Sequence, residues 1–129
     1  MRNHHALILM CALLHCGTAA AADPITLVCT GTTSHWGLDG PLIVDQPVRE
    51  SLIIDLDKSA VRGSMGSFTV IRVSESRVVF QGPYQKTQVI MSGGIDRISG
   101  EASLNVTRDG GSKLVVQYLL SCKPASPMF

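Results

Sequence analysis

Histidine, cysteine and aromatic side chains are scarce in this 129-residue chain, and more so once the first 22 residues are set aside. His35 is then the only histidine, and two cysteines and six aromatic residues remain. This set leaves little for a metal site or a nucleophile–base pair, so we predict no metal, no cofactor and no enzymatic activity. The remaining 107 residues (129 − 22) carry ten basic and ten acidic side chains. Such a balance argues against nucleic acid as a partner and against a polybasic membrane anchor.

The first 22 residues have the pattern of a cleavable secretory signal. Arg2 precedes the apolar run 6–14, and small residues end at Ala19-Ala20-Ala21-Ala22. Nine apolar residues are too few to span a bilayer, which takes about 20. We therefore predict a signal peptide over 1–22 and a single domain over 23–129 without a transmembrane segment. The predicted location is the periplasm or the extracellular space.

Two cysteines, Cys29 and Cys122, remain near opposite ends of the exported chain. Disulfides form and persist in oxidising compartments, so export favours a bond between them. Both cysteines also fall on the apolar faces of alternating segments. This shared parity is what a bond between the first and last strands inside a β-structure requires.

Apolar and polar residues alternate with period two along most of the chain after residue 23, and no segment keeps a 3.6-residue period for three turns. Short strands at regular spacing predict an all-β fold, a small antiparallel β-barrel or sandwich of seven to eight strands whose terminal strands are joined by the disulfide. The pair Gly93-Gly94 predicts a bulge or bend between two strands. The predicted strands are 25–29, 51–57, 67–73, 77–84, 87–92, 95–99, 102–107 and 113–123, with hairpin turns at 74–76 and 109–111.

The range 31–47 is rich in glycine and proline and predicts a long irregular loop, the kind of segment that is often functional. It contains Ser34, His35 and two aspartates, but proximity in sequence alone is poor support for a catalytic triad. Trp36 has two interpretations, a plug at one end of the barrel or a recognition anchor. His35 and Trp36 are therefore candidate contacts for a ligand or partner, without a catalytic role.

Two charged clusters have structural and functional interpretations. Asp55 and Asp57 project from one strand face, and a solvated face explains them better than a glycosidase or calcium site. Arg97 is a third candidate contact, since it could bind an anionic group. The alternative is an exposed ion pair between Arg97 and Glu101 across a bend at 99–100, worth about 0–1 kcal/mol.

Three segments carry a resemblance over nearly the whole exported chain: 27–32 (Leu-Val-Cys-Thr-Gly-Thr), 95–100 (Ile-Asp-Arg-Ile-Ser-Gly) and 118–124 (Tyr-Leu-Leu-Ser-Cys-Lys-Pro). In these segments the chain resembles small exported uncharacterised proteins of alphaproteobacteria, particularly rhizobial ones. The resemblance implies bacterial export and assigns no activity. A weaker similarity, at Ser92-Gly93, is to periplasmic inhibitors of c-type lysozyme, which are small disulfide-linked barrels. Those inhibitors have a following tyrosine, which this chain lacks.

These observations predict an exported, non-enzymatic binding or envelope module of the bacterial periplasm or exterior. The partner is a protein or a small molecule, and a small-molecule cavity requires an unfilled barrel interior. Two alternatives remain open, an inhibitor of a cell-wall lytic enzyme and a small hydrolase that uses the His35 loop.

Overall fold

The computed structural model describes residues 22–37, 39–85 and 87–125, and these residues form an all-β structure of eight strands. The signal peptide predicted over 1–22 lies almost entirely outside the described residues. No helix in the described ranges has the length and apolar character needed to cross a membrane. The strands are β1 (Ile25–Gly37), β2 (Gly40–Asp55), β3 (Ala60–Gly63), β4 (Gly66–Val73), β5 (Arg77–Pro83), β6 (Ile90–Asp96), β7 (Glu101–Arg108) and β8 (Lys113–Pro124), with a 3-10 turn, Asp109–Gly111, between β7 and β8.

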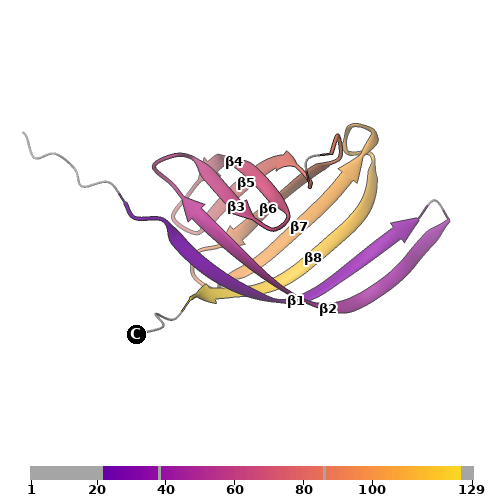
Figure 1. Ribbon diagram of the computed structural model, residues 1–129, viewed down its shortest axis with the longest axis horizontal. Helices are drawn as coiled ribbons and strands as arrows, with labels where there is room; N and C mark the ends of the chain where they lie inside the picture. The colour runs from indigo at the N-terminus through magenta and orange to yellow at the C-terminus, as the bar shows by residue number, and fades with distance from the viewer. Residues whose placement is uncertain (1–21, 38, 86, 126–129) are drawn as a thin grey trace, which may run out of the picture.

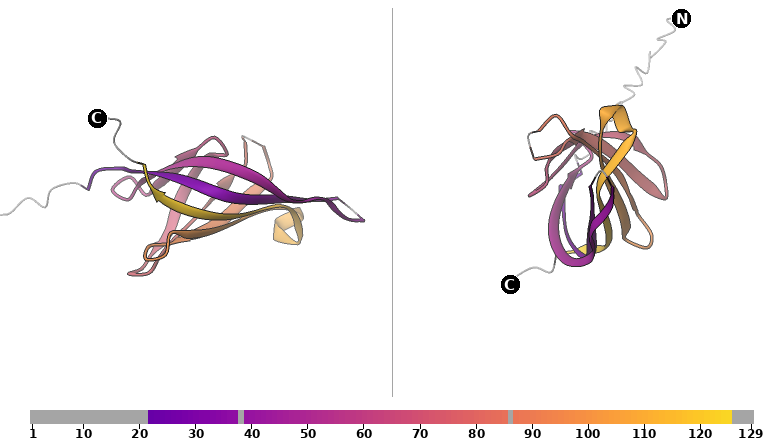
Figure 2. Two further views of the ribbon diagram at one scale, coloured as in Figure 1. Left: turned by 90° about the horizontal axis from the view of Figure 1, so that it is seen from below. Right: turned by 90° about the vertical axis from the view of Figure 1, so that its right-hand side faces the viewer.

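Each strand pairs antiparallel with the next along the chain, and β8 pairs with β1 to close a barrel (Figure 1). The predicted all-β class is therefore confirmed, and the architecture is a closed barrel rather than a sandwich. Closure gives both terminal strands a neighbour and removes two sheet edges that would otherwise attract other chains. The hairpin of β1 and β2 extends well past the barrel body, as the left view of Figure 2 also shows.

Inward-facing side chains fill the barrel because the strands alternate apolar and polar residues. The Phe68 and Phe80 rings pack with their centroids 5.8 Å apart, and Met65 and Met91 of the same core are almost completely buried. The large hollows that we find lie at the barrel mouths and on the outer wall. The buried core comprises Leu27, Cys29, Leu52, Ile54, Val61, Met65, Phe68, Phe80, Met91, Ile95, Ala102, Leu104, Val106, Val116, Tyr118, Leu120 and Cys122.

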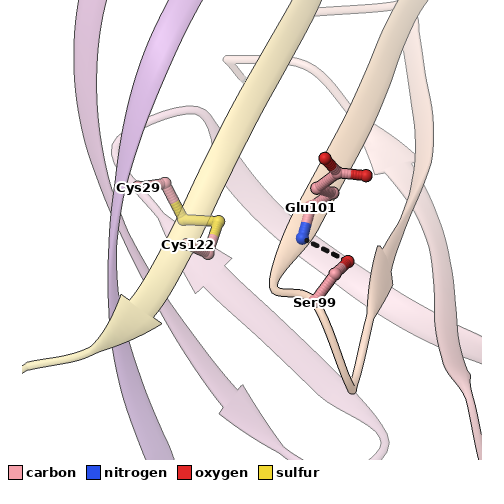
Figure 3. The surroundings of a disulfide bond; sticks show 4 residues. All are labelled: Cys29, Ser99, Glu101 and Cys122. Atoms are coloured by element: carbon pink, nitrogen blue, oxygen red, sulfur yellow. Dashed lines mark hydrogen bonds between the residues drawn. A yellow bond between two sulfur atoms is a disulfide. The ribbon is translucent and has the colours of Figure 1, made fainter.

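A disulfide joins Cys29 of β1 to Cys122 of β8, as predicted, and Figure 3 shows it between the two strands. The two cysteines are directly opposite each other in the β1–β8 register, with their Cα atoms 4.0 Å apart. Both side chains are buried in the core. The bond therefore fastens the closing seam of the barrel from the inside.

Both predicted hairpins are confirmed, β4–β5 around 74–76 and β7–β8 around 109–111. The prediction of separate strands at 87–92 and 95–99 was wrong, because one strand, β6, runs through Gly93 and Gly94. A Cβ atom on Gly93 would lie 2.5 Å from Leu104 Cδ2. The glycine therefore allows the neighbouring strand to approach closely, and it does not break β6.

Two further predicted boundaries change. The strand predicted over 51–57 ends at Asp55 and is the last part of the much longer β2. The short strand β3 was missed, because four residues are too few to display an alternating pattern.

Candidate functional site

The prediction of an irregular loop over 31–47 was wrong. These residues form the outer parts of β1 and β2. β8 pairs with β1 as far as His35, and beyond that point β1 and β2 alone continue as a two-stranded projection (Figure 1). We call the described residues 32–37 and 39–47 the ribbon. Two register shifts interrupt its pairing, and Asp45 has a positive φ of 51°. Its amide donates a hydrogen bond to Ser34 Oγ at 3.0 Å. Bulges thus accommodate the glycines and prolines without ending the strands.

His35 and Trp36, predicted contact residues, both lie on the ribbon. His35 is opposite Ile43 of β2 and Val116 of β8, whereas Trp36 is opposite Pro41 beyond the reach of β8. Both side chains are half-buried, and neither belongs to the core. The interpretation of Trp36 as a plug at the end of the barrel was therefore wrong. Its position on the ribbon leaves the recognition interpretation open.

The ribbon does not bring Ser34 and His35 together as a nucleophile and base. They are consecutive residues of a strand that keeps an unbroken register with β8, so their side chains point to opposite faces. The Ser34 oxygen also accepts the Asp45 amide hydrogen. A triad needs a hydrogen bond from nucleophile to base. Nothing in this part of the described structure has that geometry.

Sequence reasoning missed the most exposed apolar residues of the ribbon, which follow each other on β2. The exposed fractions are 74% for Leu42, 47% for Ile43 and 59% for Val44. Three consecutive apolar residues do not alternate, and the flanking prolines favoured a loop. The apolar run itself was the available signal, since it is typical of a strand covered on both faces.

The outer edge of β2 is also unusual. β3 pairs with β2 only along residues 52–55, so in the described structure the edge of β2 from 40 to 51 has no neighbouring strand. Pro41, Pro47 and the bulge at Asp45 interrupt this edge. Such features commonly prevent uncontrolled strand addition. The side chains of the ribbon are therefore better suited to recognition than its backbone.

Polar side chains gather at the barrel mouth from which the ribbon projects. The hydroxyls of Tyr84 and Tyr118 are 2.9 Å apart and share a hydrogen bond. Burial raises the pKa of Tyr118, and the hydrogen bond to Tyr84 raises it further. At the same mouth, the Glu50 carboxylate of β2 accepts a hydrogen bond from the Ser64 hydroxyl. These bonds connect β2 and β8 to the β3–β4 and β5–β6 turns beneath the ribbon.

Arg97, the third predicted contact residue, lies at the opposite end of the barrel, on the β6–β7 turn. The predicted ion pair with Glu101 does not form. Instead, Arg97 Nη1 donates to the Ser74 carbonyl oxygen at 2.7 Å, which ties the β6–β7 turn to the β4–β5 turn. The ribbon residues and Arg97 therefore belong to two separate sites.

The prediction that Asp55 and Asp57 form a solvated face was wrong for Asp55, which is only 4% exposed. Its carboxylate accepts the Lys58 amide hydrogen at 3.1 Å and faces the Lys58 ammonium at 3.9 Å. Asp55 therefore stabilises the β2–β3 turn, and Asp57 is exposed. Across the described ranges, no three histidine, cysteine, aspartate or glutamate side chains gather as a metal site would require.

Comparison with known proteins adds no relative. No family model, curated protein or solved structure matches this chain. The arrangement of the residues is therefore the basis for the function proposed below.

Proposed function

We propose that this protein is an exported, non-enzymatic module that binds another protein through its ribbon. The observation that carries the proposal is the exposure of Leu42, Ile43 and Val44 on a projection that stands clear of the barrel (Figure 1). Leu42 and Val44 lie on one face of β2 and Ile43 on the other, so both faces of the ribbon expose apolar side chains. Exposed apolar surface of this kind commonly marks a contact site. The core supports the choice of an external site, since buried apolar side chains occupy the inside of the barrel.

Charge on the ribbon indicates what surrounds its contact on the partner. Asp39 and Asp45 flank the apolar run, and the sequence contains no lysine or arginine from 31 to 48. Complementary potentials steer association and suppress wrong partners. The partner that fits is a protein with an apolar cleft and a basic rim.

The disulfide supports export. Cys29 and Cys122 are buried in the core at the closing seam, where their bond is part of the fold. Structural disulfides are rare in reducing compartments. With the predicted signal peptide, this favours the periplasm or the extracellular space. Fractionation of native cells tests it: we expect soluble extracytoplasmic protein that begins near Asp23, and protein retained in the cytoplasm would contradict export.

Site-specific photo-crosslinking in the native cell tests the ribbon. A photoreactive residue is placed at position 42 in one variant and at position 71 in a matched control. Ile71 is 60% exposed but lies on the barrel wall in β4. We expect a discrete protein adduct from position 42 and none of the same mass from position 71. Identical adducts from both positions, or none from position 42, would contradict the proposal.

A second substitution separates recognition from folding. Val44→Asp adds a charge to an exposed position, so the free energy of unfolding should change by no more than about 0.5 kcal/mol. In the photoreactive background, the same substitution should remove the adduct from position 42. Persistence of the adduct would show that the apolar run does not carry the interaction.

Inhibition of a cell-wall lytic enzyme is a second candidate, supported by a projection with the shape to enter an enzyme cleft. Ser92 and Gly93, which carry the weaker resemblance, lie within β6 on the barrel wall. Inhibition would therefore depend on the ribbon. Addition of the purified protein to a c-type lysozyme should slow cell-wall clearance, and Val44→Asp should restore it. Clearance that is unchanged by the wild-type protein would exclude this candidate for c-type lysozyme.

A further inference from the structure

The barrel mouth opposite the ribbon contains a hollow of about 500 Å³. It lies between the start of β1, the ends of β2 and β8, and the β6–β7 turn, next to the disulfide that Figure 3 shows. Its volume falls within the range of about 300–1,000 Å³ that is usual for small-molecule sites. Sites of this kind often occur at the mouths of β-barrels.

The inner part of the hollow is apolar, and two aliphatic side chains extend this character to the rim. Leu27, Ile54 and Ile95 line its inner part and belong to the buried core. Two aliphatic side chains at the rim are exposed, Ile25 at 49% and Ile98 at 85%. A narrow apolar ligand could contact the inner residues and cover both rim residues, and the burial of this surface would favour binding.

Charged side chains on the rim favour an anion. Arg97 and Lys123 line the hollow together with one carboxylate, Asp96. Asp96 Oδ1 accepts the amide hydrogens of Ile98 and Ser99, each at 2.8 Å, so this carboxylate is occupied by its own turn. One Arg97 nitrogen is bonded to the Ser74 carbonyl, and a guanidinium has further N–H donors. The lining of the hollow therefore includes two cations and one internally bonded anion.

We propose that this mouth binds a free single-chain amphiphile with an anionic head group. The alkyl chain lies in the apolar hollow, and the carboxylate or similar group lies beside Arg97 and Lys123. Charge complementarity at the rim distinguishes this ligand from a neutral apolar one, and the volume of about 500 Å³ favours a single chain. The site lies apart from the ribbon. A failure of the ligand proposal would therefore leave the proposed protein partner unaffected, and the reverse also holds.

Calorimetric titration of the oxidised protein with decanoate, below the concentration at which it forms micelles, tests the site. Acetate is the matched ligand without a chain, and decanol is the matched ligand without a charge. We expect saturable binding of decanoate, none of acetate, and weaker binding of decanol by about fivefold. Equal affinity for decanoate and decanol, or no saturable binding of decanoate, would overturn the proposal.

Variants locate the ligand. Ile98→Asp should weaken decanoate binding by about tenfold or more, because it places a charge in the chain's path and repels the head group. Lys123→Gln should weaken decanoate about threefold and leave decanol unchanged. Lys123 is exposed and makes no ion pair in the described structure, so this variant should fold normally. Arg72→Gln, on the outer wall, is the control and should change neither affinity.

A membrane is the other source of an anionic alkyl chain, and vesicles distinguish the two. In a flotation assay, the protein should not float with phosphatidylglycerol vesicles. The hollow takes up a free alkyl chain, whereas the chains of a vesicle are held in the bilayer. Retention on vesicles that Ile98→Asp abolishes, without saturable decanoate binding, would overturn the proposal in favour of a membrane contact.

Discussion

Reduction of the disulfide should strongly destabilise the barrel. Cys29 and Cys122 are 93 positions apart, so the bond closes most of the chain into one loop. In the chain-entropy model, the cross-link in the unfolded state contributes about 4.6 kcal/mol to the free energy of unfolding. Small domains have total stabilities of about 5–15 kcal/mol, so the reduced protein should be only marginally folded. The corresponding fall in Tm is about 20 °C or more.

Urea denaturation followed by circular dichroism measures this loss in the oxidised protein, the reduced protein and a Cys29→Ser/Cys122→Ser variant. The reduced unfolded chain is less compact, so its m-value should exceed that of the oxidised protein. The double variant should be at least as unstable as the reduced protein, because both side chains are buried. A loss below about 1.5 kcal/mol with an unchanged m-value would refute the reasoning.

Three further predictions concern the walls and mouths of the barrel. Gly31→Ala should cost about 3 kcal/mol or more, because the new Cβ would lie 2.0 Å from the Leu119 carbonyl oxygen; Gly37→Ala on the same strand is the control, and similar urea midpoints would contradict the clash. Asp55→Ala should cost about 1.5–3 kcal/mol through loss of the amide hydrogen bond in the β2–β3 turn, whereas an unchanged midpoint would deny this role. The free energy of unfolding should fall as the pH rises above about 10, because the folded state holds the Tyr118 proton more tightly than the unfolded chain. Tyr118→Phe should make this alkaline decline less steep, and an equally steep decline in the variant would refute the assignment to Tyr118.

Several structural features could be predicted because they depend on local alternation. The period-two pattern of β7 and β8 places Leu104, Val106 and Tyr118 inside, and the structure confirms all three as core residues. The parity of Cys29 and Cys122 predicted their bond for the same reason. A residue's face in a strand follows from its position in the pattern, whatever the rest of the chain does.

The candidate sites were harder to predict because they depend on exceptions to this pattern. Glycines and prolines in 31–47 favoured a loop, but bulges at Asp45 and its neighbours absorb them and keep β1 and β2 paired. Arg97 was expected to meet Glu101, which is close in sequence. It instead bonds to Ser74, which is 23 positions away and is brought near only when the barrel closes.

By itself, the sequence determined the β class, the parity of the two cysteines and the positions of two hairpin turns, because these follow from short-range pattern and turn chemistry. Only the tertiary structure decided that the sheet closes and that β2 extends beyond its pairing with β3, so that the ribbon projects. It also decided that an apolar hollow with two cations in its lining lies at the opposite mouth. Strand lengths, registers and the meeting of distant turns are set by the packing of the whole barrel. A property of the closed sheet is not encoded in any one segment.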